Sequence, residues 1–204
     1  RSASEGKESV LKIQISTGEK SRVATEKAKK ICAVSENQMA VLHMECINED
    51  EVIDNVGMSA VQAKYWITLY DTEEGKKQWS SVPYTVSGYT IPETLLLRDM
   101  EINGELKKVL VVSVKDRIQL IDAENGTVIR EGIFREDIVN VVQADKRRLL
   151  VGLSDGSVMI GTVEDMSANT EVGSVSGKIL DFTFSPEHQQ VIWTMKSGKR
   201  LVFG

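Results

Sequence analysis

The feature that most constrains the fold is a pattern of short strands that repeats along the chain. Over residues 94–134, four runs in which the apolar residues are mostly spaced by two follow one another. The same order of four runs returns over residues 137–176, and three runs of a third copy follow over residues 178–203. A spacing of two places alternate side chains on opposite faces of a strand, whereas a helix needs a spacing of about 3.6. The sequence therefore predicts an all-β chain of repeated antiparallel meanders.

Hairpin turns are indicated between these runs. Asn103-Gly104, Asp155-Gly156 and Glu124-Asn125-Gly126 each supply a Gly or Asn that adopts the positive φ of a tight turn. Because such turns join neighbouring antiparallel strands, the four runs of each copy are expected to form one sheet. A period of about 40 residues with four short strands is typical of the blades of a β-propeller.

Four turn sequences resemble those of the WD40-like and quinoprotein-like β-propeller families. The segment 184–187 (FSPE) is similar to the turn after the innermost strand of a WD40 blade, and the segment 153–158 (LSDGSV) is similar to the second hairpin. The octets 121–128 and 69–76 share an apolar residue followed by Asp and a late Gly, and they resemble the turn before the outer strand. The resemblance covers roughly residues 60–204 and lacks the Trp-Asp and Gly-His motifs of WD40 repeats, so it implies the architecture and no particular member.

One propeller region over residues 1–204 is predicted, with about four visible blades. The third repeat lacks a fourth strand, and residues 10–20 offer one, because they show a strand pattern followed by a Thr-Gly turn. We expect this N-terminal strand to complete the last blade and to cover its open edge. Two alternatives stay open: an unusually small closed ring, or part of a larger ring that further sequence or another chain completes.

Composition argues against two classes of partner. Asp and Glu number 30 against 25 Lys and Arg, giving a net charge of −5, so the whole chain has no electrostatic attraction to nucleic acid or anionic lipid. No apolar run approaches the length of a membrane-spanning helix, about 18 residues, and the first residues lack the pattern of a secretion signal. We expect no membrane insertion, consider nucleic-acid binding unlikely to be the role, and predict a cytoplasmic or nuclear, intracellular location.

Cysteine and histidine are scarce. Cys32 and Cys46 are the only cysteines, and His43 and His188 are the only histidines. A structural zinc site needs four such ligands, and a catalytic triad would have to recruit one of these two imidazoles without a nucleophile motif nearby. The thiols are expected to be reduced and mostly buried. We predict no metal, no cofactor and no enzymatic activity.

An acidic segment interrupts the strand pattern at residues 47–63 and is predicted to be a surface insertion. Its carboxylates are Glu49, Asp50, Glu51 and Asp54, and they lack the alternating spacing of a calcium-binding loop. A solvated loop is one interpretation, and a docking site for a basic partner is the other.

A basic triplet, Lys146, Arg147 and Arg148, follows the first run of the second repeat. Nucleic-acid grooves interleave cations with aromatic side chains on which bases stack, and this triplet has no aromatic neighbour. The pattern favours an exposed turn, and we retain the triplet as a second candidate for partner binding.

These patterns predict a noncatalytic protein-interaction scaffold, a propeller region of a larger protein or multisubunit complex whose partners are proteins. Two other functions stay open. One is binding of RNA or phosphoinositide through the basic turns, and the other is a quinoprotein-like propeller that binds a ligand or acts as an enzyme. The last would need acids and a metal that converge near the ring axis.

Overall fold

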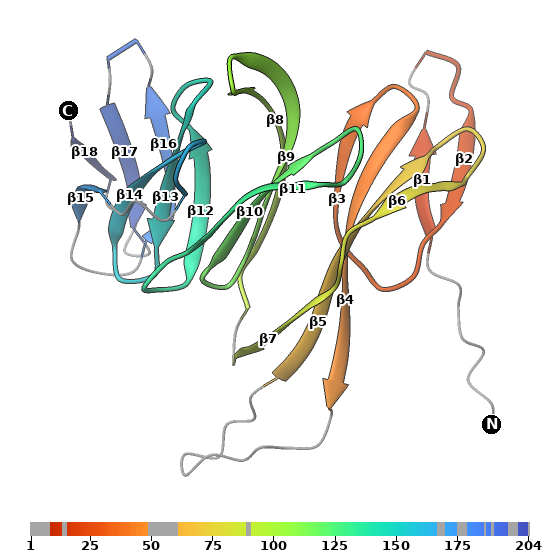
Figure 1. The fold of residues 1–204 in the computed structure, drawn as a ribbon, viewed down its shortest axis with the longest axis horizontal. Helices are drawn as coiled ribbons and strands as arrows, with labels where there is room; N and C mark the ends of the chain where they lie inside the picture. Colours follow the sequence, from red (N-terminus) through yellow and green to blue (C-terminus); the bar gives the residue numbers. More distant parts are fainter. Residues whose placement is uncertain are drawn as a thin grey trace. The chain divides into compact units, whose positions relative to one another are not determined.

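The computed structural model describes residues 9–13, 16–48, 61–88, 91–166, 170–174, 179–185, 187–188, 190–195 and 200–203. Every regular element in these residues is a β-strand, and all the strand pairings are antiparallel, which confirms the all-β prediction (Figure 1). None of the described residues forms a helix that could cross a membrane. Contacts divide the chain into two units, Arg1–Tyr89 and Thr90–Gly204, and each is described by itself.

The Thr90–Gly204 unit contains three successive meanders. The first consists of β8 (Glu93–Ile102), β9 (Glu105–Val114), β10 (Arg117–Asp122) and β11 (Val128–Ile133), paired in chain order. The second consists of β12 (Ile138–Gln143), β13 (Arg148–Leu153), β14 (Ser157–Thr162) and β15 (Thr170–Ser174). The third consists of β16 (Ile179–Ser185), β17 (Gln190–Met195) and β18 (Arg200–Phe203). The three meanders coincide with the repeats that the alternation of apolar residues predicts.

The first strands of these meanders lie next to one another. β12 contacts β8 on one side and β16 on the other (Figure 1). The backbone also joins neighbouring meanders, since the Ile138 N–H donates to the Lys115 carbonyl at 2.7 Å. Contact between the first strands of successive sheets is the arrangement of innermost strands in adjacent propeller blades.

An apolar core fills the space between the first and second meanders. Cross-strand neighbours on one face of β8–β10 supply one side of it, because side chains at every second position share a face. The buried members of this core are Met100, Ile102, Val109, Val111, Ile118 and Leu120 from the first sheet, Phe134, Ile138, Val141, Leu149, Val151, Leu153 and Met159, and Val163 and Met166 from the turn after β14. Each fully buried aliphatic side chain contributes about 1.5–3 kcal/mol, so this core is a main source of the unit's stability.

Two glycines allow the sheets to approach closely. A β-carbon built on Gly132 would lie 2.6 Å from the carbonyl oxygen of Met166, and one built on Gly152 would lie 2.6 Å from the ring of Phe182. Real β-carbons do not come this close to other heavy atoms, so both positions require a residue without a side chain. Gly132 thus fits the first sheet to the turn after β14, and Gly152 fits the second sheet to the third.

The two octets predicted to form equivalent turns adopt the same hydrogen-bond pattern. The Asp71 N–H donates to the Lys76 carbonyl at 2.8 Å, and the Asp122 N–H donates to the Thr127 carbonyl at 2.9 Å. Each aspartate carboxylate also accepts the N–H two residues later. The late glycines have φ of 66° (Gly75) and 77° (Gly126), which a residue with a β-carbon adopts only with strain. The sequence similarity of the octets therefore reflects one turn that precedes an outer strand.

The Arg1–Tyr89 unit contains two sheets. A hairpin pairs β1 (Ser9–Ile13) with β2 (Lys20–Ala24), and the second sheet consists of β3 (Ala28–Ser35), β4 (Gln38–Asn48), β5 (Val61–Asp71), β6 (Lys77–Ser80) and β7 (Tyr84–Gly88). Both β6 and β7 pair with β5, at opposite ends of it. Pro83 lies between them and cannot donate a backbone hydrogen bond, which explains why the outer strand is split.

The N-terminal strand, which was predicted to complete the last blade, pairs with its neighbour in sequence. β1 pairs with β2 in a two-stranded sheet, and β18 pairs with β17 in the sheet of the third meander. Completion of the last blade by β1 stays a prediction. The turn at Thr17-Gly18 has the predicted role, since Gly18 has a φ of 72° and reverses the chain directly into β2. Val10 and Val23 then pack with Met39 and Val41 of the neighbouring sheet.

Two predictions for this unit differ from the structure in part. The ends of the predicted insertion at 47–63 are strand, because Ile47 and Asn48 belong to β4 and β5 begins at Val61, while residues 49–60 lie outside the described residues. Cys46 is exposed and Cys32 is only half-buried, so the expected burial of the two thiols is wrong. Beyond His43, β4 no longer pairs with β3, which leaves the Cys46 end of the strand uncovered on that side.

Candidate docking groove between two blades

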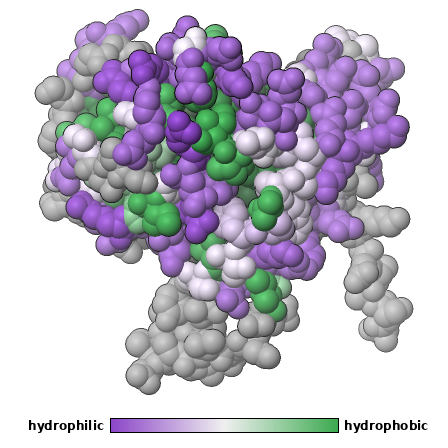
Figure 2. Space-filling model, viewed as in Figure 1, coloured by the Kyte–Doolittle hydropathy of each residue, from purple (hydrophilic) through white to green (hydrophobic). Residues whose placement is uncertain are grey.

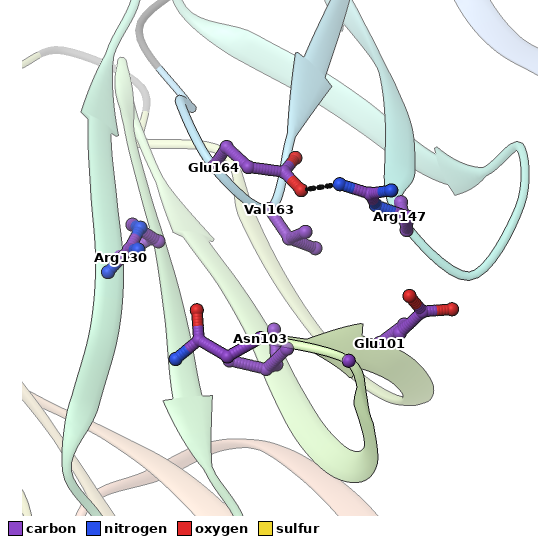
Figure 3. A pocket seen from close by; sticks show the side chains of 8 residues that line it. Glu101, Asn103, Arg130, Arg147, Val163 and Glu164 are labelled. Atoms are coloured by element: carbon purple, nitrogen blue, oxygen red, sulfur yellow. Dashed lines mark hydrogen bonds and ion pairs between the residues drawn. The ribbon is translucent and has the colours of Figure 1, made fainter.

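A groove lies between the first and second meanders of the Thr90–Gly204 unit. It consists of two adjoining pockets that share Glu101, Arg147 and Glu164. The first has a volume of about 280 Å³ and is also lined by Ile102, Asn103, Gly104, Arg130 and Val163 (Figure 3). The second has a volume of about 540 Å³ and is also lined by Asp145, Lys146, Arg148 and Thr162. The predicted basic triplet therefore forms part of one wall.

A tight turn between β12 and β13 positions the basic triplet. The Asp145 carboxylate accepts the Arg147 N–H at 2.8 Å, which closes the turn. The Lys146 carbonyl accepts the Glu101 N–H at 2.7 Å, so the turn is joined to β8 across the groove. The Gln143 side chain adds a second link, because its amide donates to the Asp99 carbonyl at 2.9 Å. One backbone hydrogen bond and one side-chain hydrogen bond thus fix the spacing of the two walls.

Carboxylates neutralise two of the three cations in the triplet. Arg147 forms an ion pair with Glu164, and Arg148 pairs with Asp145 at 2.6 Å. Hydrogen bonding to Arg147 lowers the pKa of Glu164, and the same contact raises the pKa of Arg147, with a smaller contribution from Glu101. Both partners of this pair therefore stay charged over the whole neutral range.

The rest of the first pocket carries charges without such pairs. Arg130 donates to the carbonyl oxygen of Ile129, its own neighbour, at 2.8 Å. Within the part of the chain that the structure describes, neither Arg130 nor Glu101 forms an ion pair. Figure 3 shows Arg130 and Asn103 on one side of the pocket and the Arg147–Glu164 pair on the other. The groove as a whole holds four cations and three carboxylates, and its net charge is close to zero.

Comparison with known proteins identifies the fold. No family model matches the sequence, and no curated protein matches it. Among solved structures, the C-terminal WD40 domain of Sif2 matches 97% of the chain with a TM-score of 0.60 and 13% identity. The chain folds as a WD40-like β-propeller. It spans 49% of the length of that WD40 domain, so it corresponds to about half of it.

A second solved structure, the computationally designed Ika4 protein, matches 78% of the propeller chain and is itself covered to 94%, with a TM-score of 0.49 and 13% identity. At 13% identity, the likeness to the Sif2 domain concerns the fold alone. The WD40-like part of the predicted resemblance is thereby confirmed, and the roles of individual residues have to be argued from this propeller's own structure.

The two candidate sites predicted from the sequence have different outcomes. Lys146, Arg147 and Arg148 lie together at the propeller groove, and all three are exposed, as predicted for a turn. The acidic candidates Glu49, Asp50, Glu51 and Asp54 lie outside the described residues. Their proposed role in partner binding stays a prediction.

Four polar residues that line the first pocket were missed by the sequence analysis. Glu101, Asn103, Arg130 and Glu164 come from β8, the turn after it, β11 and the turn after β14. No local motif connects them, since the blade-to-blade packing alone brings them together. Only Asn103 carried a signal in the sequence, because the Asn-Gly pair predicted a tight turn there. The structure confirms this turn with a φ of 53° at Asn103.

The described residues also bear on metal binding. Among them, no group of three or more His, Cys, Asp or Glu side chains is placed to hold an ion. His43, which the sequence analysis considered as a ligand, is buried in β4 and stacks on Trp66 with ring centroids 4.9 Å apart. Its role here is packing within the sheet.

Asp145 gives the groove a measurable pH dependence. Burial alone would raise the pKa of Asp145, but hydrogen bonds from Arg147 and Arg148 outweigh it and lower the pKa. Its stabilisation is therefore present above the unfolded pKa of about 3.9 and is lost as the pH falls through the lower folded value. We expect Asp145→Asn to cost less than about 1 kcal/mol at pH 7, because the side chain is 40% exposed, and to cost less still as the pH falls below the unfolded pKa. Urea unfolding as a function of pH measures this difference, and a loss that does not change with pH would contradict it.

Proposed function

We propose that this propeller region is a noncatalytic protein-interaction module that docks a partner protein at the groove between its first two complete meanders. The observation that carries the proposal is the balance of charge in the groove. A site for RNA or a phosphoinositide needs an excess of cations, whereas Arg147 and Arg148 are paired with carboxylates. Protein interfaces combine both signs of charge at their rims.

The scaffold supports the same proposal. A backbone hydrogen bond and the Gln143 side chain join the two walls of the groove, so a partner meets a preformed surface and loses little affinity to reordering. The groove lining is mostly charged and polar, and Figure 2 shows many hydrophilic side chains on the surface, with hydrophobic ones between them. A partner that docks at the groove recognises placed charges and hydrogen-bonding groups more than apolar area, which is the character of a non-obligate interface.

Position-resolved photo-crosslinking tests the docking site. A photo-reactive amino acid at Lys146, on the groove, is expected to capture a defined protein from a native extract. The matched control is the same amino acid at Ser154, an exposed residue in the β13–β14 turn, which lies at the other end of β13. The charge reversal Arg147→Glu should abolish capture at Lys146. Equal capture at both positions, or capture that survives the reversal, would count against the groove.

Heparin retention tests the competing function. Because paired cations release few counterions, the chain is expected to elute from heparin below about 0.15 M salt with a shallow dependence on salt concentration. The double variant Lys146→Gln/Arg148→Gln serves as the comparison and should elute at nearly the same salt. Strong retention that this variant loses would instead favour RNA or phosphoinositide binding.

A further inference from the structure

One side of the first pocket carries hydrogen-bonding groups that form no ion pair with a charged side chain of the described residues. Arg130 lies on β11 opposite Leu120 of β10, and cross-strand partners share a face of the sheet. Leu120 belongs to the core between the two meanders, so the Arg130 side chain is directed to the groove side of its sheet. Its nearest acceptor is the carbonyl of Ile129 at 2.8 Å, and the guanidinium keeps further N–H donors.

Asn103 supplies a second group on the same side. It occupies the β8–β9 turn with a φ of 53°, followed by Gly104 with a φ of 83°, so the turn conformation fixes its backbone. Figure 3 shows its side chain extending toward the strand that carries Arg130. Ile102 and Val163, only 6% and 4% exposed, supply apolar lining. Hydrogen bonds formed next to such apolar groups are stronger than those in open water.

The charges of the opposite side select among anions. A guanidinium binds a carboxylate through two parallel hydrogen bonds, and an amide adds a third. Glu101 and Glu164 also line this pocket, and their charges balance those of Arg130 and Arg147, so the pocket has no net positive charge. Removing a dianion from water costs more than removing a monoanion, and a pocket without net positive charge does not offset the difference. A carboxylate with one charge therefore fits better than a phosphate with nearly two. The volume of about 280 Å³ accommodates an amino-acid side chain.

We infer that Arg130 and Asn103 form a subsite for the carboxylate of an aspartate or glutamate in an extended segment of a partner protein. This inference rests on the proposed function and names the chemistry of the partner. The partner segment places an acidic residue in the first pocket, and the residues next to it in the partner contact the second pocket. Lys146 lines the second pocket and forms no ion pair among the described residues, so it is a further cation for the partner.

Fluorescence anisotropy with labelled peptides tests the subsite on the full chain. The probe is a twelve-residue Gly/Glu/Leu peptide, compared with versions in which Gln, Lys or phosphoserine replaces Glu. The Glu peptide is expected to bind in the millimolar range or better, and Arg130→Gln should weaken it about tenfold, as the loss of a charge-assisted pair predicts. Arg22→Gln, at an exposed position on β2 in the other unit, removes the same charge and should have no effect.

A reversed charge provides a test that misfolding cannot imitate. Arg130→Glu should lose the Glu peptide and bind the Lys peptide more tightly than the unchanged protein does. Tighter binding of the phosphoserine peptide than of the Glu peptide would overturn the carboxylate assignment, and so would absence of binding up to about 5 mM. If Lys146 still captures a partner while Arg130→Gln changes no affinity, the subsite is wrong and the docking function stands. If capture at Lys146 fails as well, both are wrong.

Discussion

Phe182→Ala is expected to lower the free energy of unfolding of the Thr90–Gly204 unit by about 3–5 kcal/mol. Phe182 is 3% exposed and packs with Leu150 and Val158 of the second meander and Val191 of the third. Truncation removes the ring that joins the two sheets and leaves a cavity that the paired backbones cannot collapse to fill. Urea unfolding followed by circular dichroism measures the loss.

Phe184 is the matched control for this truncation. It lies on the same strand and packs against the same cluster, but it is only partly buried. Phe184→Ala should therefore cost clearly less than Phe182→Ala, because less apolar surface returns to water. An equal loss for both variants would show that the burial of Phe182 between the sheets does not determine its contribution. A loss below about 1 kcal/mol for Phe182→Ala would contradict the prediction outright.

The regular part of the propeller could be predicted because local rules determine it. Over residues 94–134 and 137–176, side-chain alternation identifies the strands and Gly or Asn marks the turns. Each strand then pairs with its neighbour in sequence, as the structure shows for both sheets. The turns add no ambiguity, since Gly104, Gly126 and Gly156 all have positive φ. The strands of a meander pair only with their neighbours in sequence, so the spacing of apolar residues and the turn residues were enough to predict both sheets.

The partner of the N-terminal strand could not be predicted in the same way. The pattern over residues 10–20 identifies a strand and a Thr-Gly turn, but it does not specify which strand the first one pairs with. Six residues separate β1 from β2, so the hairpin that joins them closes a short loop at a small entropic cost.

The groove shows a second limit of sequence reasoning. The basic triplet was identifiable because its members are consecutive, but its neutralisation was not, since Glu164 lies 17 positions beyond Arg147. Arg130 and Asn103 approach the same pocket from different strands of one sheet, and nothing in their local sequence marks them. The close fit of neighbouring blades creates this site, and that fit depends on individual small residues that periodicity does not reveal.

Gly132 is the small residue whose replacement tests this fit most directly. A β-carbon there would lie 2.6 Å from the carbonyl oxygen and 2.9 Å from the carbonyl carbon of Met166. These are backbone atoms, so the turn after β14 must move to admit a methyl group. We expect Gly132→Ala to destabilise the Thr90–Gly204 unit by about 2–3 kcal/mol, which lowers the melting temperature by about 5–10 °C. Thermal unfolding monitored by circular dichroism measures the shift.

Gly161→Ala is the control, because it meets the same methionine in a different way. Its β-carbon would lie 2.7 Å from the terminal methyl carbon of Met166, which rotates away at little cost. Both variants add one methyl group at a buried position, and they differ in whether backbone or a flexible side chain must yield. Gly132→Ala should also weaken crosslinking from Lys146, since the displaced turn carries Glu164 and hence the partner of Arg147. If the two alanine variants lose the same stability, the backbone contact at Met166 does not set the spacing of the blades, and the groove does not depend on it.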